Sequence, residues 1–210
     1  MKGMIIDMAT RENVFELTTC DRALQLLKEG NSRYVSGKVL TPNFDVKDQL
    51  AEKGQAPFAI ILGCSDSRVP PEIIFDVGIG QIFTVRTAGH IANAVTIGSM
   101  EYAVEHLKAR LIVVLGHDKC GAVAASISGG DFGPNIGALI SDIKPAVDVV
   151  RAKEPGSDDI LSECEDEHVR QTAAKLSESA IFKKYIDDKT LKIVGAKYEL
   201  KSGKVVFFDK

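Results

Sequence analysis

The stretch 58-FAIILGCSDSR-68 joins an unbroken apolar run to a short polar segment, and the stretch 111-LIVVLGHDKCG-121 repeats this arrangement. The apolar runs Phe58–Leu62, Ile82–Val85 and Leu111–Leu115 show no polar alternation, which is typical of parallel strands covered on both faces. Between the last two runs, apolar residues recur at helical spacing, at Ile97, Met100, Val104 and Leu107. A strand, a helix and a second strand form the unit from which α/β sheets are built.

The segments on either side of this unit are predicted to be mainly helical. A first helix is predicted from Asp21, its N-cap, with Gly30 and Gly37 interrupting or ending it. A second helix is predicted from about Asp45 to Lys53. Beyond residue 121 the chain is predicted to be helical to about residue 188, with breaks near 129–134 and 155–156.

The C-terminal residues predict a hairpin. The runs Leu191–Leu200 and Lys204–Phe208 are joined by a Lys-Ser-Gly turn, so the last strand should lie antiparallel at the sheet edge. We therefore predict an α/β fold, with a mainly parallel sheet of four to five strands flanked by helices. A single domain is expected over residues 1–210, with an N-terminal helical arm at 1–50 and an α/β core at 55–210.

Composition excludes several classes of protein. The chain is 45% hydrophobic and 26% charged, which is typical of a globular protein with a buried core. A net charge of −3 gives no reason to expect nucleic acid or an anionic membrane as partner. No apolar run is long enough to span a bilayer. The first sixteen residues lack the features of a secretory signal and are expected to form a loosely ordered arm, so we expect a cytoplasmic protein.

Soft metal ligands follow two of the predicted strands. Cys64 comes just after the first run, and His117 and Cys120 follow the third. The carboxyl ends of neighbouring parallel strands meet at one edge of a sheet, so these three side chains are expected to come together. Two thiolates and one imidazole suit Zn²⁺, and three protein ligands leave the fourth position open, as catalysis requires. Thiolates donate more charge than neutral imidazoles, so alkaline conditions should favour activity.

Asp66 and Arg68 lie two and four residues beyond the first ligand. An arginine and a carboxylate of suitable geometry form a bidentate pair, in which Asp66 stays ionised. The carboxylate is then expected to accept a hydrogen bond from hydroxide on zinc. Without this pairing, Asp66 itself is a possible fourth ligand, which would close the site.

The remaining cysteines and histidines carry weaker signals. Cys20 and Cys164 have no ligand partner at useful spacing and are interpreted as structural thiols. His106 and His168 are interpreted as having no functional role, whereas His90 is a candidate for lining the cleft and moving protons. The acidic stretch 154–167 is interpreted as a solvated loop and helix face, because nothing in it pairs with a functional motif.

At these residues the chain resembles the β-class carbonic anhydrases. The likeness covers most of residues 20–150 and fades toward the C-terminus. A C-x-D-x-R segment followed some fifty residues later by H-x-x-C-G is highly specific to that family. The strings that carry it are GQAPFAIILGCSDSRVPPEIIFD (54–76), RTAGHIANAVTIGSMEYAVEHL (86–107) and VVLGHDKCGAV (113–123).

The resemblance implies reversible hydration of carbon dioxide to bicarbonate and a proton, by attack of hydroxide held on zinc. It implies zinc on the three ligands named above, with Asp66 and Arg68 as the catalytic dyad. Gln55 and the N–H of Gly121 are expected to bind bicarbonate oxygens, while Phe83 and Tyr102 line the cavity. In that family the cavity lies at a dimer interface, so a homodimer or homotetramer is expected, in which Gln55, Phe83 and Tyr102 serve the neighbouring subunit's zinc.

Two alternatives remain open on the same scaffold. One is a hydrolase of carbonyl sulfide or carbon disulfide, which some β-class relatives are. The other is a non-catalytic protein that binds zinc or bicarbonate, although a purely structural site has no need of an Asp66–Arg68 pair. A redox thiol protein is disfavoured, because the chain has no Cys-x-x-Cys motif.

Overall fold

Five strands form one sheet in the order β2-β1-β3-β4-β5. The computed structural model describes residues 19–40, 47–153, 156 and 158–208, so the predicted loosely ordered arm at residues 1–16 lies outside it. The strands are β1 (Ala59–Cys64), β2 (Ile82–Thr87), β3 (Leu111–His117), β4 (Lys192–Tyr198) and β5 (Val205–Phe207). The first four are parallel and β5 is antiparallel to β4, which confirms the predicted fold class and the terminal hairpin.

Central strands β1 and β3 are buried along their whole length. Both strands run further than predicted. Their uniformly apolar run continues through a glycine into the candidate ligands, so Cys64 and His117 are the last residues of the two strands. Adjacent pairing of β1 with β3 aligns Gly63 with Leu115, which brings the two strand ends side by side.

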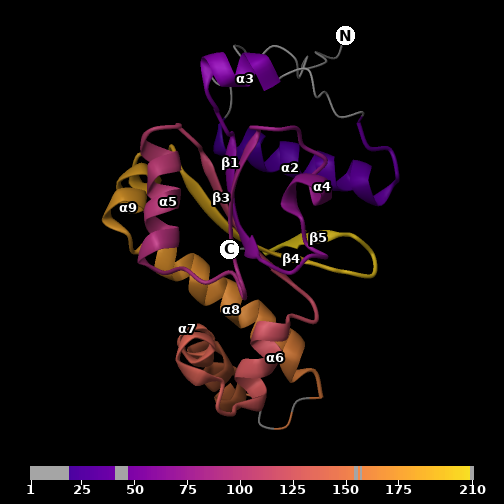
Figure 1. Ribbon diagram of the computed structural model, residues 1–210, viewed down its shortest axis with the longest axis vertical. Coiled ribbons are helices and arrows are strands. Elements are labelled where there is room, and N and C mark those ends of the chain that lie inside the picture. The colour runs from indigo at the N-terminus through magenta and orange to yellow at the C-terminus, as the bar shows by residue number, and fades with distance from the viewer. Residues whose placement is uncertain (1–18, 41–46, 154–155, 157, 209–210) are drawn as a thin grey trace.

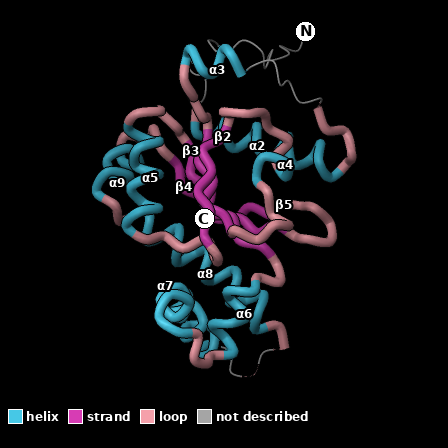
Figure 2. Tube along the Cα trace, in the orientation of Figure 1, coloured by secondary structure: helices cyan, strands magenta, loops and turns pink. Residues whose placement is uncertain are grey.

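Helices cover both faces of the sheet, as Figure 2 shows. One face, with Ile61 and Val113, packs against α2 (Cys20–Val35) and α4 (Pro71–Ile74). The opposite face, with Leu62 and Val114, packs against α5 (Ala94–Glu105), α8 (Ile160–Ser177) and α9 (Ala180–Asp187). Successive strand residues point to opposite faces, so each apolar run supplies two cores.

The first helix differs from the prediction at two points, its N-cap and the position of Gly30. It begins at Cys20 with Thr19 as N-cap, whose side chain accepts the N–H of Arg22, so the predicted Asp21 cap is wrong. Gly30 lies within the helix instead of interrupting it. A Cβ there would collide with the carbonyl oxygen of Phe75, and the glycine therefore allows α2 to approach the end of α4 closely.

The second half of the chain builds a helical layer beyond the carboxyl ends of the strands. It contains α6 (Gly121–Ser128), α7 (Gly133–Lys153) and part of α8, and Figure 1 shows α6 and α7 at the opposite end of the molecule from α3 (Lys47–Lys53). The predicted break near residues 129–134 is confirmed. A further break separates α8 from α9, where Ser179 caps the N–H of Phe182. No described helix is both long and apolar enough to cross a membrane.

Candidate metal centre

Three metal-ligand side chains meet at the carboxyl ends of β1 and β3. Cys64 ends β1, His117 ends β3, and Cys120 is the N-cap residue of α6. One ligand atom of each lies within 4.8 Å of the other two, and all three residues are buried. The structure therefore brings together the set that the spacing predicted, although 53 residues separate the first two.

His117 is oriented as a metal ligand. Its Nδ1 lies 2.9 Å from the carbonyl oxygen of Asp118, a contact in which Nδ1–H donates and Nε2 keeps its lone pair. That Nε2 is buried and has no hydrogen-bond partner. An unsatisfied buried nitrogen is costly, whereas a metal ion bound to it and to two sulfurs would use its lone pair. The donor set therefore fits Zn²⁺.

The pKa values of the two cysteine thiols are shifted in opposite directions. A hydrogen bond from Cys120 lowers the pKa of Cys64 to about 4, although burial opposes the shift. The N–H groups of Gly89 and Asp66, 3.3 and 3.4 Å from Cys64 Sγ, favour the thiolate further. The same hydrogen bond, together with burial, raises the pKa of Cys120. A cation that displaces the proton of Cys120 would meet two thiolates.

Asp66 and Arg68 form a bidentate pair beside the three ligands. Arg68 Nε donates to Oδ1 at 2.9 Å and Nη2 donates to Oδ2 at 2.7 Å, while the Arg68 backbone N–H also donates to Oδ1. These hydrogen bonds lower the pKa of Asp66 to about 2. Oδ2 lies 3.9 Å from Nε2 of His117. The carboxylate is thus ionised and held by Arg68 at the edge of the ligand group.

Arg86, at the end of β2, fixes the backbone of the first ligand segment. Its Nε donates to the carbonyl of Cys64 at 2.8 Å and its Nη2 to the carbonyl of Asp66 at 2.6 Å. The sequence alone assigned no such role to Arg86. The pairing of Gly63 with Arg86 across β1 and β2 explains how the guanidinium reaches these carbonyl groups.

The four predicted substrate-binding residues divide into two groups. Gly121 opens α6 directly after Cys120, so its N–H lies at the metal centre. Phe83 pairs with Ile60, four residues before Cys64, and is therefore roughly 13 Å from that end of the sheet. Gln55 is exposed in the segment before β1, and Tyr102 is half exposed on α5. Within one chain, the side chains of Phe83, Gln55 and Tyr102 therefore do not gather at the metal ligands.

The acidic stretch 154–167 was predicted to be a solvated face, but one of its carboxylates is buried against the metal centre. Glu165 is only 2% exposed, and its Oε1 accepts the N–H of Cys120 at 2.9 Å. The interpretation that nothing in this stretch pairs with a functional motif is therefore wrong. Sequence spacing offers no signal for the pair, because 45 residues separate the two partners.

Two histidines also differ from their predictions. His90 is 1% exposed and packs on His168, with ring centroids 4.4 Å apart, so it lies in the interior instead of lining a cleft. Burial lowers the pKa of His90 well below its usual value, which keeps the ring neutral. His168 is buried as well, and its Nε2 donates to the carbonyl of Gly89 at 2.8 Å. It therefore supports the residue whose N–H donates to Cys64.

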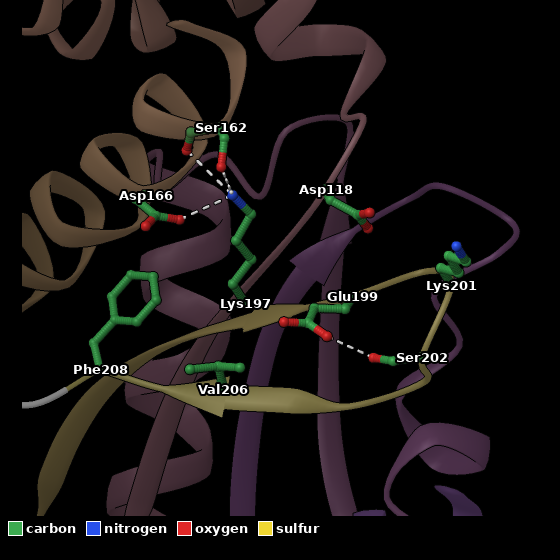
Figure 3. Close-up of a pocket in the computed structure, with 9 residues that line it drawn as sticks. All are labelled: Asp118, Ser162, Asp166, Lys197, Glu199, Lys201, Ser202, Val206 and Phe208. Carbon is green, nitrogen blue, oxygen red and sulfur yellow. Dashed lines mark hydrogen bonds and ion pairs between the residues drawn. The ribbon is translucent and has the colours of Figure 1, made fainter. Parts of the chain in front are cut away.

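A hollow of about 680 Å³ opens between α8 and the β4–β5 hairpin, next to the metal centre but without any of its ligands. Figure 3 shows Lys197 extending from β4 into this region and ending beside Ser162 and Asp166 of α8. The hollow is lined by Asp118, Ser162, Asp166, Lys197, Glu199, Lys201, Ser202, Val206 and Phe208. Lys197 and Asp166 are paired with each other at 3.0 Å, and none of the four predicted substrate-binding residues lines this hollow.

Comparisons with known proteins agree with this geometry. A family model described as carbonic anhydrase matches residues 59–205. Carbonic anhydrase 2 of Mycobacterium tuberculosis is 42% identical over 191 residues, which cover 89% of this chain and 92% of that protein. A carbonic anhydrase of Mycolicibacterium smegmatis is 41% identical over 187 residues, which cover 87% and 90% of the two chains.

Solved structures give the same result. A β-carbonic anhydrase of Coccomyxa, solved with acetazolamide, aligns with a TM-score of 0.72 and 26% identity, covering 89% of this chain and 86% of that one. A tetrameric β-carbonic anhydrase of Sordaria macrospora aligns with a TM-score of 0.72 and 25% identity, covering 80% and 88%. With the sequence matches and the shared fold, the chain belongs to the carbonic anhydrase family, in its β class.

Proposed function

We propose that this chain is a zinc-dependent carbonic anhydrase that catalyses the reversible hydration of carbon dioxide to bicarbonate and a proton. The observation that carries the proposal is the buried group of Cys64, His117 and Cys120 beside an ionised Asp66. Zinc held there would act as a Lewis acid and lower the pKa of a coordinated water, supplying hydroxide near neutral pH. The cysteines must stay reduced to serve as ligands, which favours the cytoplasm.

Asp66 orients the nucleophile in this proposal. Its Oδ2 lies 3.9 Å from Nε2 of His117, so the carboxylate borders the space in front of that nitrogen. An ionised carboxylate only accepts hydrogen bonds, and it would therefore take one from the attacking oxygen and direct a lone pair of that oxygen toward substrate. Arg68 occupies both carboxylate oxygens and so keeps Asp66 from turning inward to become a fourth ligand.

Gly121 offers a place for the anionic product. It is the first residue of α6, and the first N–H groups of a helix have no partner within the helix. No atom lies within 4 Å of the position that a Cβ at Gly121 would take, so open space adjoins this backbone. A bicarbonate oxygen would accept this N–H at the positive end of the helix dipole.

The rest of the cavity is proposed to come from a second copy of the chain. Tyr102 is 51% exposed on α5, and Val95, two turns earlier on the same side of that helix, is 78% exposed. Phe83 lies on the edge strand β2. Together with Gln55, these side chains are available to the neighbouring subunit's site. The assembly would be contradicted if sedimentation showed a monomer at protein concentrations where the enzyme is fully active.

The proposal is tested by stopped-flow carbon dioxide hydration between about pH 7 and 9, normalised to bound zinc. We expect zinc-dependent turnover that rises with pH. Asp66→Asn should lower turnover about 100-fold or more while zinc content persists, because positioned groups that handle protons contribute at least this much. The matched control is Asp148→Asn, which removes an exposed carboxylate paired with Lys144 on α7.

Zinc binding without turnover across this range would reject carbon dioxide hydration. Assays with carbonyl sulfide and carbon disulfide would then separate the hydrolase alternative from a non-catalytic zinc or bicarbonate-binding protein. Turnover that survives Asp66→Asn unchanged would retain the enzyme but reject the role of Asp66.

A further inference from the structure

Helix α8 buries the ionisable side chains of a glutamate and a histidine on the face that it turns toward the metal centre. Glu165 is 2% exposed and His168 is 3% exposed, and three residues separate them, so they lie on the same side of the helix. Burying polar groups is costly unless each is hydrogen-bonded. Their partners therefore indicate what this helix face stabilises.

Glu165 connects α8 to the segment that carries the last ligand. Its Oε1 accepts the N–H of Cys120 at 2.9 Å, and its Oε2 is paired with Nζ of Lys197 at 3.0 Å. Lys197 is 12% exposed in its side chain and also contacts Asp166 at 3.0 Å and Ser162 Oγ at 2.9 Å (Figure 3). The carboxylate is thus neutralised from one side and holds the ligand backbone from the other.

His168 connects the same helix to the other thiolate. Its Nε2–H donates to the carbonyl of Gly89 at 2.8 Å, and the N–H of Gly89 donates to Cys64 Sγ at 3.3 Å. Gly89 has a φ of +70° and packs tightly, since a Cβ there would lie 2.9 Å from Cδ1 of Ile143. A change in the His168 contact would therefore displace the donor to Cys64.

We propose that Glu165 and His168 are positioning residues for the two thiolates of the metal site. Each acts through the backbone of one residue. Glu165 accepts the N–H of Cys120 itself, and His168 holds the carbonyl of Gly89, whose N–H donates to Cys64. One turn of α8 thus supports both sulfurs, which lie within 4.8 Å of each other and of the ligand nitrogen of His117. The inference rests on the zinc site of the proposed function and assigns its support to α8, which follows the ligand motifs in the sequence.

Two substitutions at each position separate the hydrogen bond from packing. Glu165→Gln keeps a carbonyl oxygen for the N–H of Cys120, whereas Glu165→Met keeps the length of the side chain and removes the acceptor. His168→Gln keeps an N–H donor near the position of Nε2, whereas His168→Leu removes it. The control is Glu167→Gln, which removes a charge from the same helix at a residue that contacts Gln171 and Lys153 instead of the site.

Zinc affinity is measured by competition with a chromophoric chelator, and the cobalt-substituted protein reports thiolate geometry through its sulfur-to-metal charge-transfer band. We expect Glu165→Met and His168→Leu each to weaken zinc binding by about 10–100-fold, the usual effect of losing a partner of a metal ligand. Both should also shift the cobalt band. Glu165→Gln, His168→Gln and the Glu167→Gln control should remain close to wild type in both measurements.

Variants that lose thermal stability but keep wild-type zinc affinity and cobalt spectrum would overturn the inference, because α8 would then have a structural role only. Equal losses in Glu165→Gln and Glu165→Met would overturn the role of the acceptor. If Glu165→Met fails to fold, the His168 pair decides in the same way. A wild-type protein that binds no zinc would overturn the proposed function as well, which distinguishes the two failures.

Discussion

Replacement of Gly89 by alanine probes the backbone next to the first thiolate. Gly89 has a φ of +70°, and placing a residue with a Cβ in this left-handed region costs about 1–2 kcal/mol. The new Cβ would also lie 2.9 Å from Cδ1 of Ile143 and 3.2 Å from the Cβ of Ala122. Overpacking of this kind costs about 1–3 kcal/mol, so the free energy of unfolding should fall by roughly 2–5 kcal/mol.

A double-mutant cycle with Ile143→Val separates the two causes. Valine lacks Cδ1, and this substitution alone should cost about 0.5–1.5 kcal/mol. In the Ile143→Val background the closest contact is gone, so Gly89→Ala should then cost little more than the conformational part, about 1–2 kcal/mol, with the 3.2 Å contact to the Cβ of Ala122 remaining. The expected coupling between the two substitutions is therefore about 1–3 kcal/mol.

The assay is guanidinium denaturation followed by far-UV circular dichroism, at fixed protomer and zinc concentrations because binding shifts apparent stability. Equal costs of Gly89→Ala in the two backgrounds would refute the contact with Ile143. A cost well below 1 kcal/mol in both would refute the argument from backbone conformation.

Three further predictions concern stability. Gly137→Ala, in a part of α7 where a new Cβ meets nothing within 4 Å, should raise the free energy of unfolding by roughly 0.5–1 kcal/mol. Gly30→Ala brings the same gain in helix propensity, but it should lower the free energy of unfolding in the same denaturation assay, because the Cβ would collide with the backbone of Phe75. Arg68 lowers the pKa of Asp66 to about 2, so stability from the ionised carboxylate should be complete above about pH 4 and lost as pH falls through about 2. The stability difference between wild type and Asp66→Asn, measured on zinc-free protein, should therefore shrink across that window and stay constant above it.

Local sequence was sufficient to predict the parts of the fold in which consecutive residues are all buried. Phe58–Leu62 and Leu111–Leu115 are apolar at every position because both faces of β1 and β3 are covered. The candidate ligands end these same strands, so pairing of β1 with β3 was enough to bring Cys64 and His117 together. The prediction of the ligand group required only the topology of a parallel sheet.

Contacts set by tertiary packing were not predictable in this way. Glu165 and His168 lie in a segment rich in carboxylates, and their burial depends on how α8 crosses the carboxyl end of the sheet. His90 follows a strand end, where exposure is common, yet the ring of His168 covers it. Gly30 resembles a helix breaker until the approach of Phe75 is known. In each case the decisive neighbour is at least 45 residues away in the chain.

Two ion pairs balance the carboxylates around the metal centre, and they differ in how far they are exposed to solvent. At the rim, Asp66 is paired with Arg68, and their side chains are 17% and 52% exposed, so solvent screens this pair in part and reaches Asp66. In the interior, Glu165 and Lys197 are 2% and 12% exposed, and a lone charge there would be strongly destabilising. The two carboxylates are therefore suited to different tasks. The partly exposed carboxylate of Asp66 can exchange hydrogen bonds during a reaction, whereas the buried carboxylate of Glu165 is held by Lys197 and fixes the backbone of Cys120.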